Sequence, residues 1–258
     1  MSAESSNFVS VMKKLFLLVL PVLLCAACTS VSDCRQVGTV ERDTLMGVPC
    51  MVYLPCQYAE RVKAEKTVFP VLYLQHGMYG CEDDWTEQGF LLRHMDSLLQ
   101  AGAVKEMVIV MPDNCPRRPT WEEEKANATN GEWENNFAEF MAEAESRYSI
   151  STEPAQRAIA GLSMGGYHTM QVSYVLDGRF AYVGMFSPAT FVHHAPSSPE
   201  LFWIAIGKED FLYGSLQEYR QWLDANHIEY TYYESAGAHT WDNWQDYLCR
   251  FLPKLFKK

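Results

Sequence analysis

The sequence has 258 residues, of which 48% are hydrophobic, so one large domain with a sizeable core is expected. Its aromatic content of 13% is typical of a globular protein and excludes a largely disordered chain. The formal net charge of −11 argues against a nucleic-acid-binding protein, because binding to phosphates needs a basic face.

Residues 1–36 predict an export signal with a short linker, and residues 37–258 predict a single domain. Lys13 and Lys14 precede an apolar run, residues 15–27, which is short for a membrane span and ends in small residues. Met12 is the natural start of such a signal. We therefore expect an exported protein, either periplasmic or attached to the cell envelope.

The end of this signal, Cys25-Ala26-Ala27-Cys28, resembles a bacterial lipobox. Cys28 would then be lipidated, and this anchor would be the only contact with a membrane. The segment departs from the lipobox pattern because Cys25 stands where leucine is usual. Ordinary signal-peptidase cleavage after Ala27 is the alternative.

The cysteines that follow the signal form no C-x-x-C pair and no Cys/His spacing typical of zinc. Export permits disulfides. Cys81 and Cys115 both come just after predicted strands, at what should be the same edge of a sheet, so they are a candidate pair. Free buried cysteines are the equal alternative.

Short apolar runs alternate with helical patterns after residue 36. An N-terminal hairpin is expected first, and near-continuous apolar runs predict strands buried on both faces. The expected strands are residues 36–45, 49–55, 68–77, 106–113, 157–163, 182–188, 201–210 and 228–237. The expected helices are residues 87–100, 133–148, 165–175, 216–225 and 241–251. This alternation predicts an α/β fold with a mainly parallel sheet.

Reactive groups of such sheets lie beyond the carboxyl ends of the strands. Ser163, Asp210 and His239 each follow a predicted strand, in the chain order nucleophile, acid, base. Asp113 also follows a strand, but it precedes the serine and suits a turn or helix N-cap.

Ser163 is the centre of Gly161-Leu162-Ser163-Met164-Gly165, which matches the G-x-S-x-G nucleophile elbow between a strand and a helix. The turn strains the serine backbone, and the glycines give clearance. The helix N-terminus favours developing negative charge. The alternative is a close-packed structural corner that only needs glycine.

His76 and Gly77 end an earlier strand at a turn that can present backbone N–H groups to an oxyanion. We expect Met78 and Met164 to be the donors, with Gly77 in place of Met78 if the loop is shifted by one residue. His76 is expected to brace the loop.

Asp210 is expected to orient the base and to stabilise its imidazolium form, whereas its neighbour Glu209 should face solvent. His239 lies between the last strand and the last helix, where a loop can place an imidazole on the serine as general base and acid.

Five segments resemble the esterase D branch of the α/β-hydrolases, which includes feruloyl, acetylxylan and tributyrin-type esterases, S-formylglutathione hydrolases and mycolyltransferases. In family order they are LQHGMYGCEDDW (74–85), AGLSMGGYHTM (160–170), FSPA (186–189), GKEDFLY (207–213) and GAHTWDNW (237–244). The resemblance implies the α/β-hydrolase fold, with about eight strands, helices on both faces and no large lid.

The resemblance also implies Ser163 as nucleophile, Asp210 as acid and His239 as base. It implies that the segment ending at Trp85 shapes the mouth of the site, so Gly77 and Trp85 are expected to contact substrate. The alternative for Trp85 is that it packs this loop. Residues 115–135 are expected to form either a substrate-side loop or a solvated loop with aromatic anchors.

The sequence therefore predicts an exported serine carboxylesterase that hydrolyses short-chain acyl or feruloyl esters on carbohydrate through an acyl-enzyme on Ser163. Its expected partner is a small-molecule or oligosaccharide ester, and no metal or organic cofactor is implied. An acyltransferase of the same fold is the alternative, and a non-catalytic binding protein is a third hypothesis.

Overall fold

A computed structural model describes residues 38–114, 120–126 and 131–257 of the chain. The expected signal, its Cys28 and also Cys115 lie outside these residues, so export and lipidation stay predictions. Within the described residues, no helix has the length and apolar character needed to cross a membrane.

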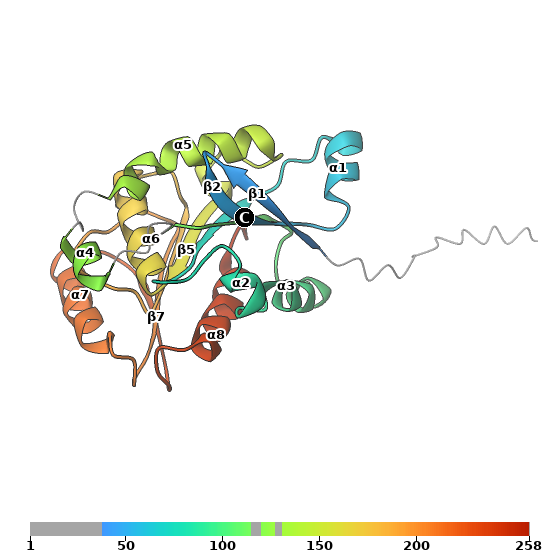
Figure 1. Cartoon of the computed structure of the whole chain (residues 1–258). Coiled ribbons are helices and arrows are strands. Elements are labelled where there is room, and N and C mark those ends of the chain that lie inside the picture. The colour runs from blue at the N-terminus through green and yellow to red at the C-terminus, as the bar shows by residue number, and fades with distance from the viewer. Residues whose placement is uncertain (1–37, 115–119, 127–130, 258) are drawn as a thin grey trace, which may run out of the picture. The chain divides into compact units, whose positions relative to one another are not determined.

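The described residues form one eight-stranded sheet with the strand order β1-β2-β4-β3-β5-β6-β7-β8 (Figure 1). β1 and β2 form the expected hairpin, and β2 also pairs antiparallel with β4, whereas all other pairs are parallel. The strands are β1 (Thr39–Leu45), β2 (Val48–Leu54), β3 (Val71–Gln75), β4 (Val108–Pro112), β5 (Arg157–Leu162), β6 (Tyr182–Phe186), β7 (Leu201–Gly207) and β8 (Thr231–Ser235).

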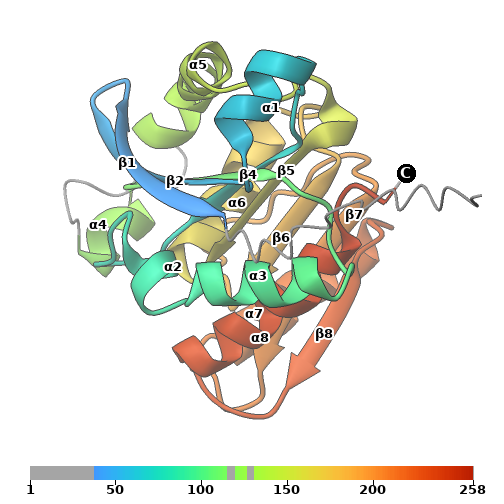
Figure 2. The same cartoon turned by 90° about the vertical axis from the view of Figure 1, so that its right-hand side faces the viewer.

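Helices cover both faces of this sheet, as predicted. Figures 1 and 2 show α5 and α6 on one face and α3 and α8 on the other. The helices are α1 (Tyr58–Glu65), α2 (Asp84–Glu87), α3 (Leu91–Gln100), α4 (Trp121–Ala126), α5 (Glu132–Arg147), α6 (Met164–Val175), α7 (Tyr213–Ala225) and α8 (Trp241–Phe251).

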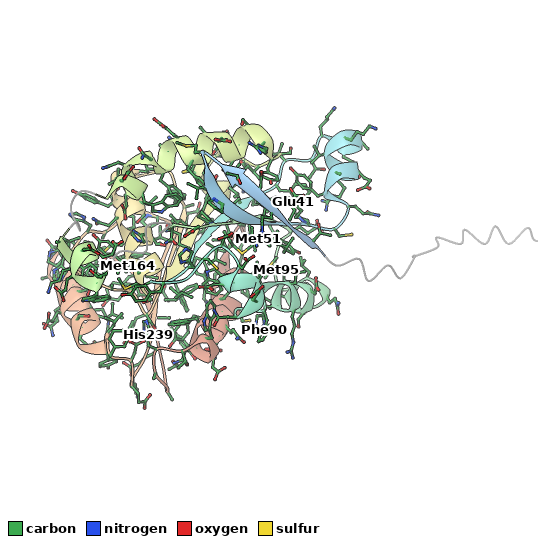
Figure 3. The ribbon with its side chains drawn as sticks, viewed as in Figure 1. Glu41, Met51, Phe90, Met95, Met164 and His239 are labelled. Atoms are coloured by element: carbon green, nitrogen blue, oxygen red, sulfur yellow. The ribbon has the colours of Figure 1, made fainter. Side chains whose placement is uncertain are left out.

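Two hydrophobic cores result, one on each face. Along β3, Val71 and Tyr73 belong to the core beneath α5 and α6, whereas Leu72 and Leu74 belong to the core beneath α3 and α8. This alternation is the two-residue period of a strand buried on both sides. Met95 of α3 belongs to the second core, and Met51 of β2 packs against it; both are labelled in Figure 3.

Three helices were not predicted. α1 has eight residues and buries none of them completely; only Tyr58 and Val62 pack against the core, which is too few to show an apolar period. α2 and α4 have only four and six residues, too few to show a period.

The predicted α/β-hydrolase architecture, without a large lid between Ser163 and Asp210, is confirmed.

Candidate active site

Ser163 lies between β5 and α6 with a positive φ of 53° and a ψ of −116°. A non-glycine residue in such a conformation costs about 1–3 kcal/mol and persists only when its surroundings fix it. The Ser163 N–H donates to the Phe186 carbonyl at 2.8 Å, and the Ser163 carbonyl accepts from Tyr167 and Ala189, both at 3.1 Å. These bonds hold the turn in its strained form.

The elbow glycines provide the clearance expected of them. A Cβ added at Gly161 would lie 2.3 Å from the Gly165 carbonyl oxygen, and one at Gly165 would lie 2.2 Å from the His76 carbonyl oxygen. Neither neighbour can move aside easily, because both are backbone atoms. Glycine is therefore required at positions 161 and 165, because a side chain there would prevent the close approach of β5, α6 and the loop after β3.

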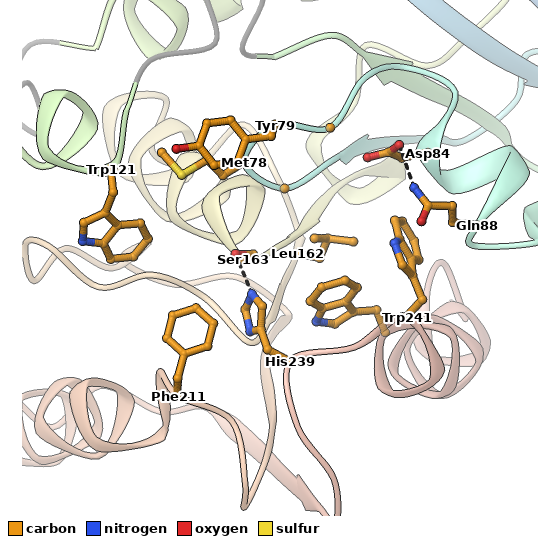
Figure 4. Close-up of a pocket in the computed structure, with 13 residues that line it drawn as sticks. Met78, Tyr79, Asp84, Gln88, Trp121, Leu162, Ser163, Phe211, His239 and Trp241 are labelled. Atoms are coloured by element: carbon orange, nitrogen blue, oxygen red, sulfur yellow. Dashed lines mark hydrogen bonds between the residues drawn. The ribbon is translucent and has the colours of Figure 1, made fainter.

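The structure brings Ser163, His239 and Asp210 together. Ser163 Oγ lies 2.8 Å from His239 Nε2 (Figure 4), and His239 Nδ1 lies 2.8 Å from Asp210 Oδ2. The Asp210 side chain is fully buried, and its Oδ1 accepts the Leu212 backbone N–H at 2.9 Å. A neutral imidazole that donates from Nδ1 to Asp210 leaves Nε2 as an acceptor for the serine hydroxyl.

The loop that carries His239 is fixed to the end of β7. Glu209 is exposed, as predicted, but its carboxylate also accepts the Gly237 N–H, and its own N–H donates to the Gly237 carbonyl at 3.1 Å. The rings of Phe211 and Trp244 flank the imidazole, with centroids at 4.6 and 4.8 Å. No pattern in the sequence indicates that Glu209 fixes this loop.

Gly77 and Met78 begin the turn that faces Ser163. The Gly80 N–H donates to the Gly77 carbonyl at 3.1 Å, and Tyr79 adopts a φ of 62°. A Cβ at Gly77 would lie 3.3 Å from Ser163 Cβ, so this turn lies against the elbow. Met164 is the first residue of α6, where N–H groups have no acceptor within the helix.

His76 braces this turn. Its side chain is buried, with Nδ1 2.7 Å from the Gly77 carbonyl oxygen and Nε2 3.1 Å from Asp113 Oδ1. Asn114 adds a bond from its side-chain amide to the His76 carbonyl at 3.3 Å. Asp113 therefore contacts His76, whereas Asp210 contacts His239.

Gln75, the residue before His76, was not predicted to matter. It is fully buried, and its amide donates to Thr169 Oγ1 at 3.0 Å and accepts the Trp133 indole N–H at 2.7 Å. Its carbonyl accepts the Trp85 indole N–H at 3.1 Å. The only signal in the sequence is a glutamine at the end of an otherwise apolar strand.

A cavity of about 380 Å³ opens above Ser163. Its walls come from the turn after β3, from α2 and α4, and from the loops that carry the acid and the base (Figure 4). The lining residues are Gly77, Met78, Tyr79, Gly80, Asp84, Gln88, Trp121, Leu162, Ser163, Phe211, His239, Trp241 and Trp244. No group of three or more metal-ligating side chains converges in the part of the chain that the structure describes.

Gly77 and Met78 line this cavity, but Trp85 does not. Trp85 is 1% exposed and packs edge-on against Trp241, with centroids at 5.3 Å. Its position favours the packing alternative over substrate contact. Trp121 does line the cavity, so this part of residues 115–135 lies on the substrate side.

Cys81 is a free thiol in the structure, 3.9 Å from Asp84 Oδ1. Burial, as the largest cause, raises the pKa of this thiol. Because Cys115 is not among the described residues, the described part of the chain does not support the candidate disulfide.

Comparison with known proteins places the chain in a family. Residues 46–225 match the family model described as "Putative esterase". The chain is 27% identical over 210 residues to an endo-1,4-beta-xylanase/feruloyl esterase of Xylanibacter ruminicola, covering 80% of this chain and 29% of that protein. It is 30% identical over 133 residues to an esterase of Mycobacterium tuberculosis, covering 50% of this chain and 26% of that protein. The chain thus spans less than a third of the length of either relative.

Solved structures of similar proteins agree with this match. The ferulic acid esterase of Anaeromyces mucronatus superposes with a TM-score of 0.70 at 25% identity, covering 85% of this chain and 91% of that one. A feruloyl esterase module of Clostridium thermocellum has the same fold, with a TM-score of 0.68 at 21% identity, covering 87% and 90% of the two chains. The chain belongs to the esterase family whose model it matches over most of its length.

Proposed function

We propose that this protein is a serine carboxylesterase that cleaves esters of short or aryl carboxylic acids. The observation that carries the proposal is the chain of two 2.8 Å contacts from Ser163 through His239 to the buried Asp210, at the base of an open cavity. A serine hydroxyl held by a neutral imidazole, which is itself held by a carboxylate, is the arrangement needed to activate a weak nucleophile.

In the proposed reaction, Ser163 Oγ attacks the ester carbonyl while His239 Nε2 takes the hydroxyl proton. The N–H groups of Met78 and Met164 stabilise the oxyanion, and His239 then returns the proton to the departing alcohol. Water, deprotonated by the same imidazole, cleaves the acyl-enzyme and releases the acid. Asp210 stabilises the imidazolium in both steps.

Aryl acids are favoured by two observations. The Anaeromyces mucronatus esterase, at 25% identity, is known in complex with ferulic acid. In this chain, Tyr79 and Phe211 expose 65% and 70% of their surface beside the cavity, which offers flat apolar faces to a planar ring. The predicted N-terminal signal supports export, and we propose that the substrate is met outside the cytoplasm.

Hydrolysis of methyl ferulate and p-nitrophenyl acetate by the purified protein tests this proposal, together with labelling by a fluorophosphonate probe. We expect turnover of both esters and labelling that is absent in Ser163→Ala. Folded protein with neither turnover nor labelling would instead support a non-catalytic binding protein. Transfer of the acyl group to an added sugar, in preference to water, would identify an acyltransferase.

A further inference from the structure

Gln75 is the last residue of β3, and it lies between the two segments that carry the proposed oxyanion donors. The turn with Met78 follows it along the chain, and Met164 begins α6 on the other side. Figure 4 shows Met78 on the turn beside Ser163. Two backbone N–H groups can stabilise one oxyanion only when both lie within hydrogen-bonding distance of the same oxygen atom. The separation between this turn and α6 therefore affects the reaction.

Backbone contact sets the smallest separation of the two segments. A Cβ added at Gly165 would lie 2.7 Å from the Gln75 carbonyl oxygen and 2.2 Å from the His76 carbonyl oxygen, so only glycine allows this approach. Backbone packed against backbone resists a shorter separation. It does not by itself prevent the end of β3 and the start of α6 from moving apart.

A buried hydrogen bond opposes a larger separation. The Gln75 side-chain amide donates to Thr169 Oγ1, in the second turn of α6, at 3.0 Å, and both residues are fully buried. Because water does not reach these groups, breaking the bond would leave a polar donor and a polar acceptor unsatisfied in the interior. The bond is therefore a direct link between the end of β3 and the helix that begins at Met164.

Trp133 fixes the direction in which the Gln75 amide faces. The Trp133 indole N–H donates to Gln75 Oε1 at 2.7 Å, and an indole nitrogen can only donate, so the amide nitrogen is left to face Thr169. The Gln75 backbone carbonyl accepts the indole N–H of Trp85, from the core on the other face, at 3.1 Å. Leucine and methionine at this position would offer neither group of the amide, and ionised glutamate would lack the donor.

We propose that Gln75 is a positioning residue that fixes the spacing between the N–H groups of Met78 and Met164. The backbone contact at Gly165 limits how close these groups come, and the bond to Thr169 limits how far apart they move. Gln75 acts through the backbone, because it is fully buried and is not among the residues that line the cavity. This inference rests on the proposed esterase function, since the spacing matters only when an oxyanion forms.

The test measures oxyanion stabilisation in Gln75→Leu and Thr169→Val, which remove the bond from either end. With p-nitrophenyl acetate, kcat should fall by roughly 10–100-fold in each variant while KM changes by less than about twofold, because the loss arises in the transition state. Thr169→Ser keeps the hydroxyl and should have a kcat close to that of the wild type.

An inhibitor separates positioning from a general loss of structure. When phenyl trifluoromethyl ketone binds, Ser163 Oγ adds to its carbonyl carbon, the hydroxyl proton passes to His239 Nε2, and the ketone oxygen becomes an oxyanion. This oxyanion needs the same two N–H groups as the transition state. The inhibition constant should therefore rise in Gln75→Leu and Thr169→Val by the same factor by which kcat falls.

Val110→Ala is the matched control, because Val110 is fully buried on β4 and its side chain has no hydrogen bond to lose. It should lower the free energy of unfolding in urea and leave kcat and the inhibition constant unchanged. The same result for Gln75→Leu and Thr169→Val would show that Gln75 only packs the core, and would overturn the inference. If Gln75→Leu does not fold, the comparison of Thr169→Val with Thr169→Ser gives the answer.

The two proposals fail in different ways. An active wild type whose kcat and inhibition constant are unaffected by loss of the bond would disprove the role of Gln75 and leave the esterase function intact. A wild type that neither cleaves the ester nor binds the ketone would disprove the esterase function and this inference together.

Discussion

Asp210 holds His239 through one carboxylate oxygen and holds its own loop through the other. Oδ2 lies 2.8 Å from His239 Nδ1, while Oδ1 accepts the Leu212 N–H at 2.9 Å. The orientation of the imidazole is therefore tied to the end of β7, and the proton on Nδ1 has a fixed acceptor. Loss of this acceptor should change the tautomer of His239 rather than the fold.

Asp210→Asn should lower kcat for p-nitrophenyl acetate by about 10⁴-fold, because an amide favours the wrong tautomer of the histidine. Asp113→Asn is the matched control, since Asp113 also follows a strand but contacts His76. We expect the control to reduce kcat by less than tenfold. Steady-state kinetics of both variants show which aspartate is the acid. A larger loss of kcat in Asp113→Asn than in Asp210→Asn would make Asp113 the acid.

Ser163→Ala should abolish ester hydrolysis while leaving the thermal midpoint nearly unchanged, because only the hydroxyl is removed. Ser163→Gly should also be inactive but more stable than Ser163→Ala by about 1 kcal/mol, since glycine accepts a positive φ without strain. Thermal unfolding of the two variants measures this difference. The exposed Ser198→Ala is the activity control. Retained activity in Ser163→Ala would disprove the assignment of the nucleophile.

Gly165→Ala should destabilise the protein by more than about 3 kcal/mol or prevent its folding, because the new methyl would overlap the His76 carbonyl oxygen. Gly214→Ala is the matched control within α7, where a Cβ meets nothing within 4 Å. It should stabilise the protein by about 0.5–1 kcal/mol through helix propensity. Urea unfolding of both variants should give shifts of opposite sign, and equal shifts would contradict the close approach at Gly165.

Glu134 of α5 and His168 of α6 form a buried ion pair. Burial raises the pKa of the Glu134 carboxyl, but the charge and hydrogen bond of the His168 imidazole outweigh burial and hold this pKa below its ordinary value. A carboxyl whose pKa is lower in the folded state stabilises the fold above its unfolded pKa of about 4.3, and this contribution is lost as the pH falls through the folded pKa.

Glu134→Gln should therefore destabilise the protein at pH 7, by roughly 1–3 kcal/mol, and the deficit relative to wild type should shrink as the pH falls from 5 towards 3. Urea unfolding across this pH range measures the free energy of unfolding. Glu139→Gln, exposed on the same helix, should give a pH-independent difference close to zero. A constant deficit for Glu134→Gln would show that its ionisation does not contribute to stability.

Much of the site could be predicted because its signals are local. The elbow needs glycine at fixed distances from Ser163, and buried strands need unbroken apolar runs. The chain order Ser163, Asp210, His239 places all three residues after strands. Parallel strands deliver such residues to one edge of the sheet, so their proximity follows from topology alone.

Other features have no local signal. Trp85 lies beside residues of the predicted site in the sequence, yet its ring turns into the core. Gln75 joins Trp133 and Thr169, which are distant from it along the chain. Helix α1 packs only Tyr58 and Val62 against the core, which is too few residues to mark a helical period.

The sequence by itself determined the α/β architecture, the nucleophile elbow and the candidate acid and base. Hydrophobic periodicity and the residue preferences of turns depend on residues that are close together along the chain, so the sequence alone reveals them. The tertiary structure alone decided which side chains share a wall of the cavity. Asp84, Gln88 and Trp241 come together because α2 packs beside the start of α8, and a contact between distant segments depends on how whole elements fill space.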